Sequence, residues 1–70
     1  MKTVEIRGDY IELYKLLKFE ALASSGAEAK TLIAEGQVSV NGVVETRKRK
    51  KLALGDTVTV FGDTYTITAP

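Results

Sequence analysis

The hydrophobic period of this chain changes near its middle. From residue 10 to residue 33, apolar side chains recur three and four positions apart, which places them on one face of a helix. From residue 38 to residue 67, apolar and polar side chains alternate, as in a strand with one buried face. This order predicts an α+β fold, in which two short N-terminal helices (a helix-turn-helix) pack on a small, mainly antiparallel sheet of three to five strands. The length of 70 residues predicts a single domain over residues 1–70.

The first helix is predicted from Tyr10 to about Ala21. Asp9 would be its N-cap, because Glu12 follows three residues later at capping-box spacing. The side chains predicted on its apolar face are Tyr10, Leu13, Tyr14, Leu17 and Ala21, with Leu16 widening the stripe.

The second helix is predicted to begin after the small residues ASSG. Ser25 would be its N-cap, and Glu28 completes a Ser-x-x-Glu capping box. Ala29, Leu32 and Ile33 would face the core. Gly36 is predicted to end the helix in a left-handed conformation.

Turn signals divide the second half of the chain into strands. Asn41-Gly42 lies between valines and predicts a hairpin, because both turn positions need positive φ. Further turns are predicted at Leu54–Asp56 and at Gly62-Asp63. The inward-facing side chains would be Val58, Val60, Tyr65 and Ile67. Thr3–Arg7 also alternates and is predicted as a strand that pairs with the last one.

The composition excludes several classes of site. The chain has neither Cys nor His, so it can form no disulfide, no thiolate or imidazole metal site, and no Ser–His or Cys–His catalytic pair. We therefore expect no enzymatic activity, no metal, no cofactor and no small-molecule substrate. No apolar run reaches the ~18 residues that a membrane span needs, and no signal-peptide core is present. We expect a cytoplasmic protein with no membrane partner.

Positive charge is concentrated in the run Arg47–Lys51. The chain has ten basic and nine acidic residues, a net charge of +1, yet half of the basic residues are consecutive here. One or two Lys would be enough to protect an edge strand from aggregation. Five adjacent like charges repel one another, which favours a polyanionic partner. In an extended segment alternate bases would face opposite sides, so all five reach one partner only if the segment bulges or loops.

An ordered set of small motifs runs from Leu13 to Gly42 and resumes at Gly55-Asp56. The motifs are Leu22-Ala23-Ser24-Ser25, Ala29-Lys30, Leu32-Ile33, Gly36, Val38, Val40 and Asn41-Gly42. In this order they resemble the small RNA-binding domain named after ribosomal protein S four, also called the alpha-L motif. The resemblance is to the stand-alone bacterial branch. At three positions where relatives often have Arg, this chain has Glu12, Gly26 and Thr31.

This resemblance implies a non-enzymatic protein that contacts the phosphate backbone of structured RNA, such as ribosomal RNA or tRNA. It also implies the ribosome or its precursors as partners, and we expect a monomer. The candidate RNA-binding residues are Lys15, Lys18, Ser24, Ser25, Gly26, Lys30, Arg47, Lys48, Arg49, Lys50 and Lys51. They comprise the basic run, the helix lysines and the start of the second helix, where backbone amides can bind phosphate.

Other interpretations stay open. The three helix lysines also fit as solubilising flanks, and Ser24, Ser25 and Gly26 also fit as an ordinary helix cap. Tyr10, Tyr14 and Tyr65 are expected in the core or at its rim rather than as stacking platforms for bases. The whole protein would also fit a general DNA or polyanion binder, or a protein-interaction module whose basic strand docks an acidic partner.

Overall fold

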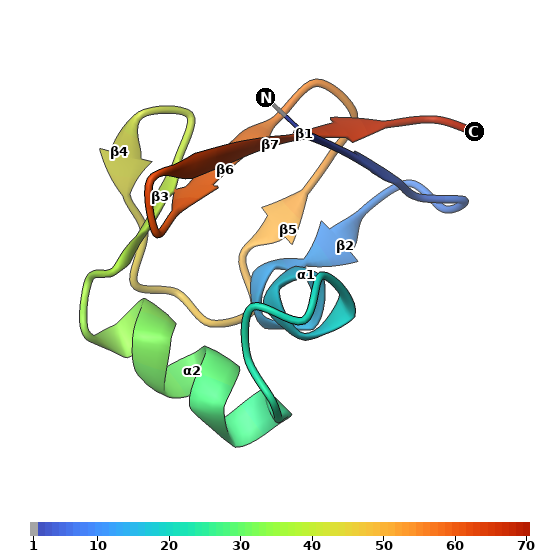
Figure 1. Ribbon diagram of the computed structural model, residues 1–70. Coiled ribbons are helices and arrows are strands. Elements are labelled where there is room, and N and C mark those ends of the chain that lie inside the picture. The colour runs from blue at the N-terminus through green and yellow to red at the C-terminus, as the bar shows by residue number, and fades with distance from the viewer. Residues whose placement is uncertain (1) are drawn as a thin grey trace.

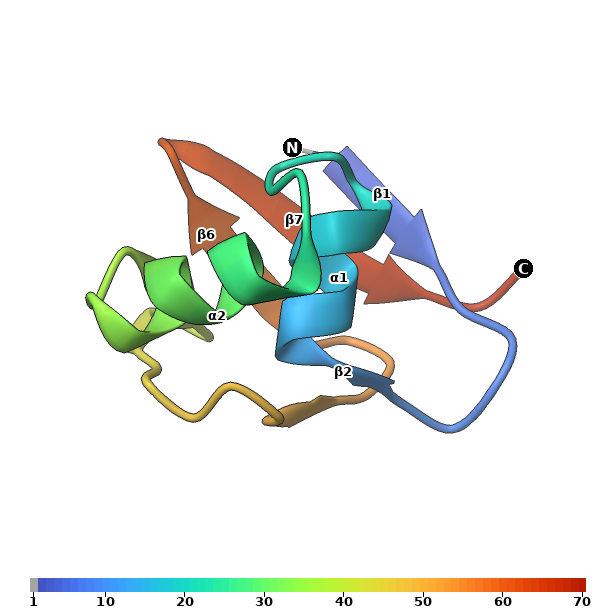
Figure 2. The same ribbon diagram turned by 90° about the horizontal axis from the view of Figure 1, so that it is seen from below.

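A computed structural model describes residues 2–70, which form two helices and seven short strands. In chain order these are β1 (Lys2–Glu5), β2 (Ile11–Glu12), α1 (Leu13–Phe19), α2 (Gly26–Ala34), β3 (Val38–Val40), β4 (Val43–Val44), β5 (Lys51–Leu52), β6 (Thr57–Val60) and β7 (Asp63–Thr68). Five strands make one sheet in the order β1-β7-β6-β3-β4, and β2 pairs with β5 in a second sheet. Both helices lie on the same face of the large sheet (Figure 1), and Figure 2 shows them from that side.

The predicted α+β class is confirmed. The large sheet is antiparallel except at β1, which runs parallel to β7 with Val4 opposite Ile67. The predicted pairing between the first and last strands is therefore confirmed. The helices are not the first elements of the fold, because β1 and the unpredicted β2 precede them.

The turns follow the backbone preferences of their residues, with one shift. Asn41 and Gly42 have φ of 51° and 83°, as predicted for a tight hairpin. The next hairpin turns at Phe61-Gly62, with φ of 53° and 81°, so the prediction of Gly62-Asp63 was wrong by one residue. Phe is a poor residue for a left-handed position, so it gave no turn signal there.

The predicted bounds of the first helix were wrong at both ends. Tyr10 lies before the helix, and the N-cap is Glu12 rather than Asp9, with no side-chain cap bond. At the other end the backbone of Ala21 is left-handed (φ 57°), so the helix ends at Phe19. The amide of Leu22 donates to the carbonyl of Leu17 (2.9 Å) and the amide of Ala21 to that of Lys18 (3.1 Å), which is the Schellman pattern, with Ala in the position usually held by Gly.

The predictions for the second helix are confirmed. The Ser25 hydroxyl accepts a hydrogen bond from the Glu28 amide at 3.1 Å, and Gly36 has φ of 77° after the last turn. One detail differs, because the Glu28 carboxylate accepts from the amide of Ser24 (3.2 Å) rather than from that of Ser25.

One hydrophobic core lies between the helices and the sheet. The helices contribute Leu13, Leu16, Leu17, Ala29 and Ile33, and the strands contribute Val4, Val38, Val40, Leu52, Val58, Val60, Tyr65 and Ile67, all of them buried. This matches the predicted strand faces and most of the predicted helix faces. Neither α1 nor α2 is long enough to cross a bilayer, and over residues 2–70 no other helix exists that could.

Candidate functional site

The run of five bases begins in a turn and ends in a strand. The amide of Lys50 donates to the carbonyl of Arg47 at 3.2 Å, which closes a turn, and Lys51 then enters β5. We call residues Arg47–Lys50 the basic loop. The sequence analysis left two alternatives for the run, an extended strand or a segment that loops. The structure has a loop over Arg47–Lys50.

The backbone of the basic loop caps helix α1. The amides of Leu13 and Tyr14 donate to the carbonyls of Lys50 (2.9 Å) and Lys48 (3.1 Å). These two amides belong to the first turn of α1, where no intrahelical partner exists. The carbonyls of the loop thus replace the side-chain cap that had been predicted from Asp9. Because the main chain makes these bonds, the cap uses none of the side chains of the loop. Arg47, Lys48 and Arg49 are exposed, and Lys50 is half-buried.

The ring of Tyr14 brings cations from three elements together. Measured to the ring centroid, the Lys30 ammonium of α2 lies at 4.8 Å, the Lys15 ammonium of α1 at 5.9 Å and the Arg49 guanidinium of the basic loop at 6.0 Å. These distances are within the range of cation–π attraction, which partly offsets the repulsion among the cations. Tyr14 is half-buried and packs against the hydrophobic core, which holds the residue in place.

Two shallow hollows share residues with this cluster. One, of about 440 Å³, is lined by Arg47, Arg49, Lys50 and Lys51. The other, of about 380 Å³, is lined by Tyr14, Lys15, Lys18 and Phe19. We call the cationic side chains around Tyr14 the basic surface: Lys15, Lys18, Lys30, Arg47, Lys48, Arg49, Lys50 and Lys51. At its border the Lys51 ammonium lies 4.8 Å from the ring centroid of Tyr10.

Two carboxylates hold two of these cations. Nε and Nη2 of Arg47 donate to the two oxygens of Glu45 at 2.9 and 3.0 Å, and the Arg47 amide adds a third bond at 3.0 Å. These bonds lower the pKa of Glu45 from 4.5 to about 2. Lys15 Nζ lies 3.1 Å from the Glu12 carboxylate, and this hydrogen bond raises the pKa of Lys15. Both acids reduce the charge that the basic surface offers to a partner.

The start of α2 lies beside Tyr14, but the hydroxyls of Ser24 and Ser25 and the Ser24 amide already have partners. A Cβ atom on Gly26 would lie 3.9 Å from the Tyr14 ring, so this turn borders the basic surface. The Glu28 carboxylate accepts bonds from the Ser24 hydroxyl (2.9 Å) and the Ser24 amide. An anion from a partner would have to displace this carboxylate to reach the same donors.

The fold thus brings Lys15, Lys30 and Arg49 to the Tyr14 ring, with the Ser24–Gly26 turn beside it. Lys18 lines the hollow that contains Tyr14, and the hollow that contains Arg49 is also lined by Arg47, Lys50 and Lys51. Lys48 is exposed in the basic loop, where its carbonyl accepts from the amide of Tyr14. Tyr14 is the residue whose role the sequence analysis missed, since it was assigned only to the core or its rim. In the sequence, only the neighbouring Lys15 indicated that cations lie near Tyr14. Lys30 and Arg49 are distant in the chain and come close to Tyr14 only in the folded protein. Among residues 2–70, no group of three or more Asp, Glu, His or Cys side chains is placed to hold a metal ion. The chemistry of the surface is that of a binding site for closely spaced phosphates.

Comparison with known proteins gives consistent results. A family model described as S4 domain matches residues 4–68. The "Putative RNA-binding protein YbcJ" of Escherichia coli (strain K12) and the "Uncharacterized protein YbcJ" of Shigella flexneri are each 52% identical over 60 residues, which is 86% of this chain and 86% of each relative. The solution structure of YbcJ from E. coli has a TM-score of 0.73 and 47% sequence identity, and the match covers 99% of this chain and 89% of that one. YbcJ is described there as containing an AlfaL motif involved in RNA-binding.

Proposed function

The chain belongs to the S4 domain family, and from that premise we propose that it is a non-enzymatic protein that binds structured RNA through the basic surface. Structured RNA such as ribosomal RNA or tRNA presents A-form helices, which proteins recognise mainly by shape and by backbone contacts. A surface of cations from several elements suits such a target, because each cation can neutralise a different phosphate. The protein acts as a monomer in this proposal, and specificity comes from the shape of the RNA.

The observation that carries the proposal is the convergence on Tyr14. Lys15, Lys30 and Arg49 come from three elements and lie within 6.0 Å of one ring centroid. Charges that served only solubility would gain nothing from gathering at one point, because like charges repel. Their concentration is explained if a polyanion occupies the surface. The relative YbcJ, named a putative RNA-binding protein, favours RNA as that polyanion.

The test is a variant in which Lys48, Arg49, Lys50 and Lys51 are all replaced by Gln. The fold should persist, because the carbonyls of Lys48 and Lys50 that cap α1 belong to the main chain. Four lost phosphate contacts, each worth about 0.9 decade at 0.1 M salt, predict a loss of about three and a half orders of magnitude in affinity for duplex RNA. A thermal melt and a fluorescence titration measure the two quantities. Binding by the folded variant that equals the parent's would refute the proposal.

Two controls define what is being measured. Lys2→Gln removes a cation that also lies over a tyrosine ring, 5.6 Å from the centroid of Tyr65, but on β1. Its RNA affinity should stay within about twofold of the parent's, since it removes no contact of the basic surface. Competition between RNA and DNA duplexes at matched salt then separates RNA binding from general polyanion binding. Equal competition would assign the surface to polyanions in general.

A further inference from the structure

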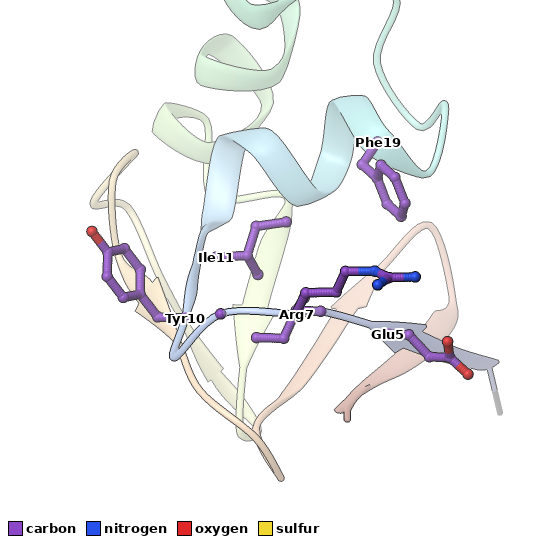
Figure 3. A pocket seen from close by; sticks show the side chains of 7 residues that line it. Glu5, Arg7, Tyr10, Ile11 and Phe19 are labelled. Carbon is purple, nitrogen blue, oxygen red and sulfur yellow. The ribbon is translucent and has the colours of Figure 1, made fainter. Parts of the chain in front are cut away.

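A third shallow hollow adjoins the basic surface at the end of α1. It has a volume of about 380 Å³, within the range of about 300–1,000 Å³ typical of small-ligand sites. Figure 3 shows Phe19 reaching from α1 into the space beside the Arg7 side chain, with Ile11 pointing into the hollow and Tyr10 and Glu5 at opposite ends. The walls therefore combine aromatic, aliphatic and charged groups.

Phe19 is the most exposed large hydrophobic residue of this hollow. Its relative exposure is 67%, and that of Tyr10 is 48%. Exposed aromatic rings beside a concave surface are typical of binding sites, because each ring offers a large flat face. Arg7 has a guanidinium that forms no salt bridge with any residue from 2 to 70, so its donors are available to a ligand.

Phe19 also lines the neighbouring hollow that contains Lys15 and Lys18. A planar group stacked on Phe19 would therefore carry its attached phosphate close to two ammonium groups. A nucleotide has this combination of a planar base and a phosphate. Unpaired bases of RNA are commonly stacked on aromatic side chains or guanidinium planes and hydrogen-bonded at their edges, and a guanidinium has several N–H donors.

We infer that this hollow binds an unpaired nucleobase of the bound RNA, with the base stacked on Phe19 and its edge facing Arg7. The inference rests on the proposed RNA-binding function and extends it, because phosphate contacts alone do not distinguish paired from unpaired RNA. The site gives the protein a preference for duplexes that end in, or are interrupted by, unpaired nucleotides. Glu5 at the far end adds an acceptor for a base amino group.

The experiment compares two probes that have the same phosphates. One is a short RNA duplex with a single-stranded adenosine overhang, and the other is the same duplex with an abasic overhang. The parent protein should bind the adenosine probe about 5- to 160-fold more tightly, which is the contribution of one base–aromatic stack. Phe19→Ala should abolish this difference, and Phe19→Tyr should retain it because the ring remains.

Phe61→Ala is the matched control, since Phe61 is 61% exposed but lies in the β6–β7 turn, and it should leave the difference unchanged. Equal binding of the two probes by the parent would overturn the inference and would point to a protein partner for the hollow. A difference that persists in Phe19→Ala would overturn it as well. If the parent binds neither probe, the proposed function itself fails, which is a distinct result.

Discussion

The Glu45–Arg47 pair makes a quantitative prediction about RNA binding. Arg47 is 71% exposed in its side chain, yet both of its donor groups that face Glu45 are occupied by that carboxylate at 2.9 and 3.0 Å. In Glu45→Gln the negative charge is removed while the side chain keeps its size. The guanidinium then becomes available to a phosphate. We therefore expect this substitution to strengthen RNA binding.

The magnitude follows from counterion release. One additional phosphate contact makes the slope of log K against log salt steeper by about 0.9 for duplex RNA, if it behaves as B-form DNA does. At 0.1 M salt this equals an affinity gain of about 8-fold. The gain should shrink as salt is raised towards 1 M, where the counterion term vanishes.

The assay is a series of fluorescence titrations with duplex RNA between low and high salt, on the parent and on Glu45→Gln. Asp63→Asn is the matched control, because it also removes one carboxylate from an exposed pair, with Lys2 at 3.7 Å, but lies at the start of β7. It should change neither slope nor affinity. If Glu45→Gln leaves the slope unchanged while a melt shows it folded, Arg47 is not a phosphate contact and the reasoning is refuted.

Three further predictions concern stability. Ser25→Ala should lower the free energy of unfolding by about 0.5–2 kcal/mol, measured by urea titration, because α2 loses its N-cap; an unchanged value would mean that the cap bond contributes nothing. Phe61→Asn should raise that free energy by up to about 1 kcal/mol, since Asn tolerates the left-handed conformation better than Phe, and a loss of stability would show that the exposed ring is packed. The pKa of Asp56 is lowered from 3.8 by hydrogen bonds from the Ala53 amide and the Asn41 side chain. The stabilisation of the fold by the ionised Asp56 is therefore complete above about pH 4 and is lost as the pH falls through the lowered value. In Asp56→Asn the free energy of unfolding should fall less steeply at acid pH than in the parent, and an identical fall in both proteins would contradict this.

Much of the fold was determined by local sequence. The change of period from helical to alternating separates the helices from β3, β6 and β7, and the inward faces of β6 and β7 were predicted correctly. Three of these signals act only on residues close to them in the chain. Ser25 caps the start of α2, Gly36 ends that helix in a left-handed conformation, and Asn41-Gly42 forms a type I′ turn. Such features need no tertiary contact, which is why the sequence is sufficient to place them.

The start of α1 and the candidate site were decided by tertiary structure. Asp9 had the spacing of a cap, but the amides of Leu13 and Tyr14 instead bond to carbonyls of the basic loop, which lies next to the β2–β5 pair. Every residue has a main-chain carbonyl, so no residue type in the sequence predicts such a bond. The sequence by itself determined how many cations the chain has and that five are consecutive. Only the fold decided that Lys30 and Arg49 meet at Tyr14, because contacts between distant segments depend on how the helices and strands pack together.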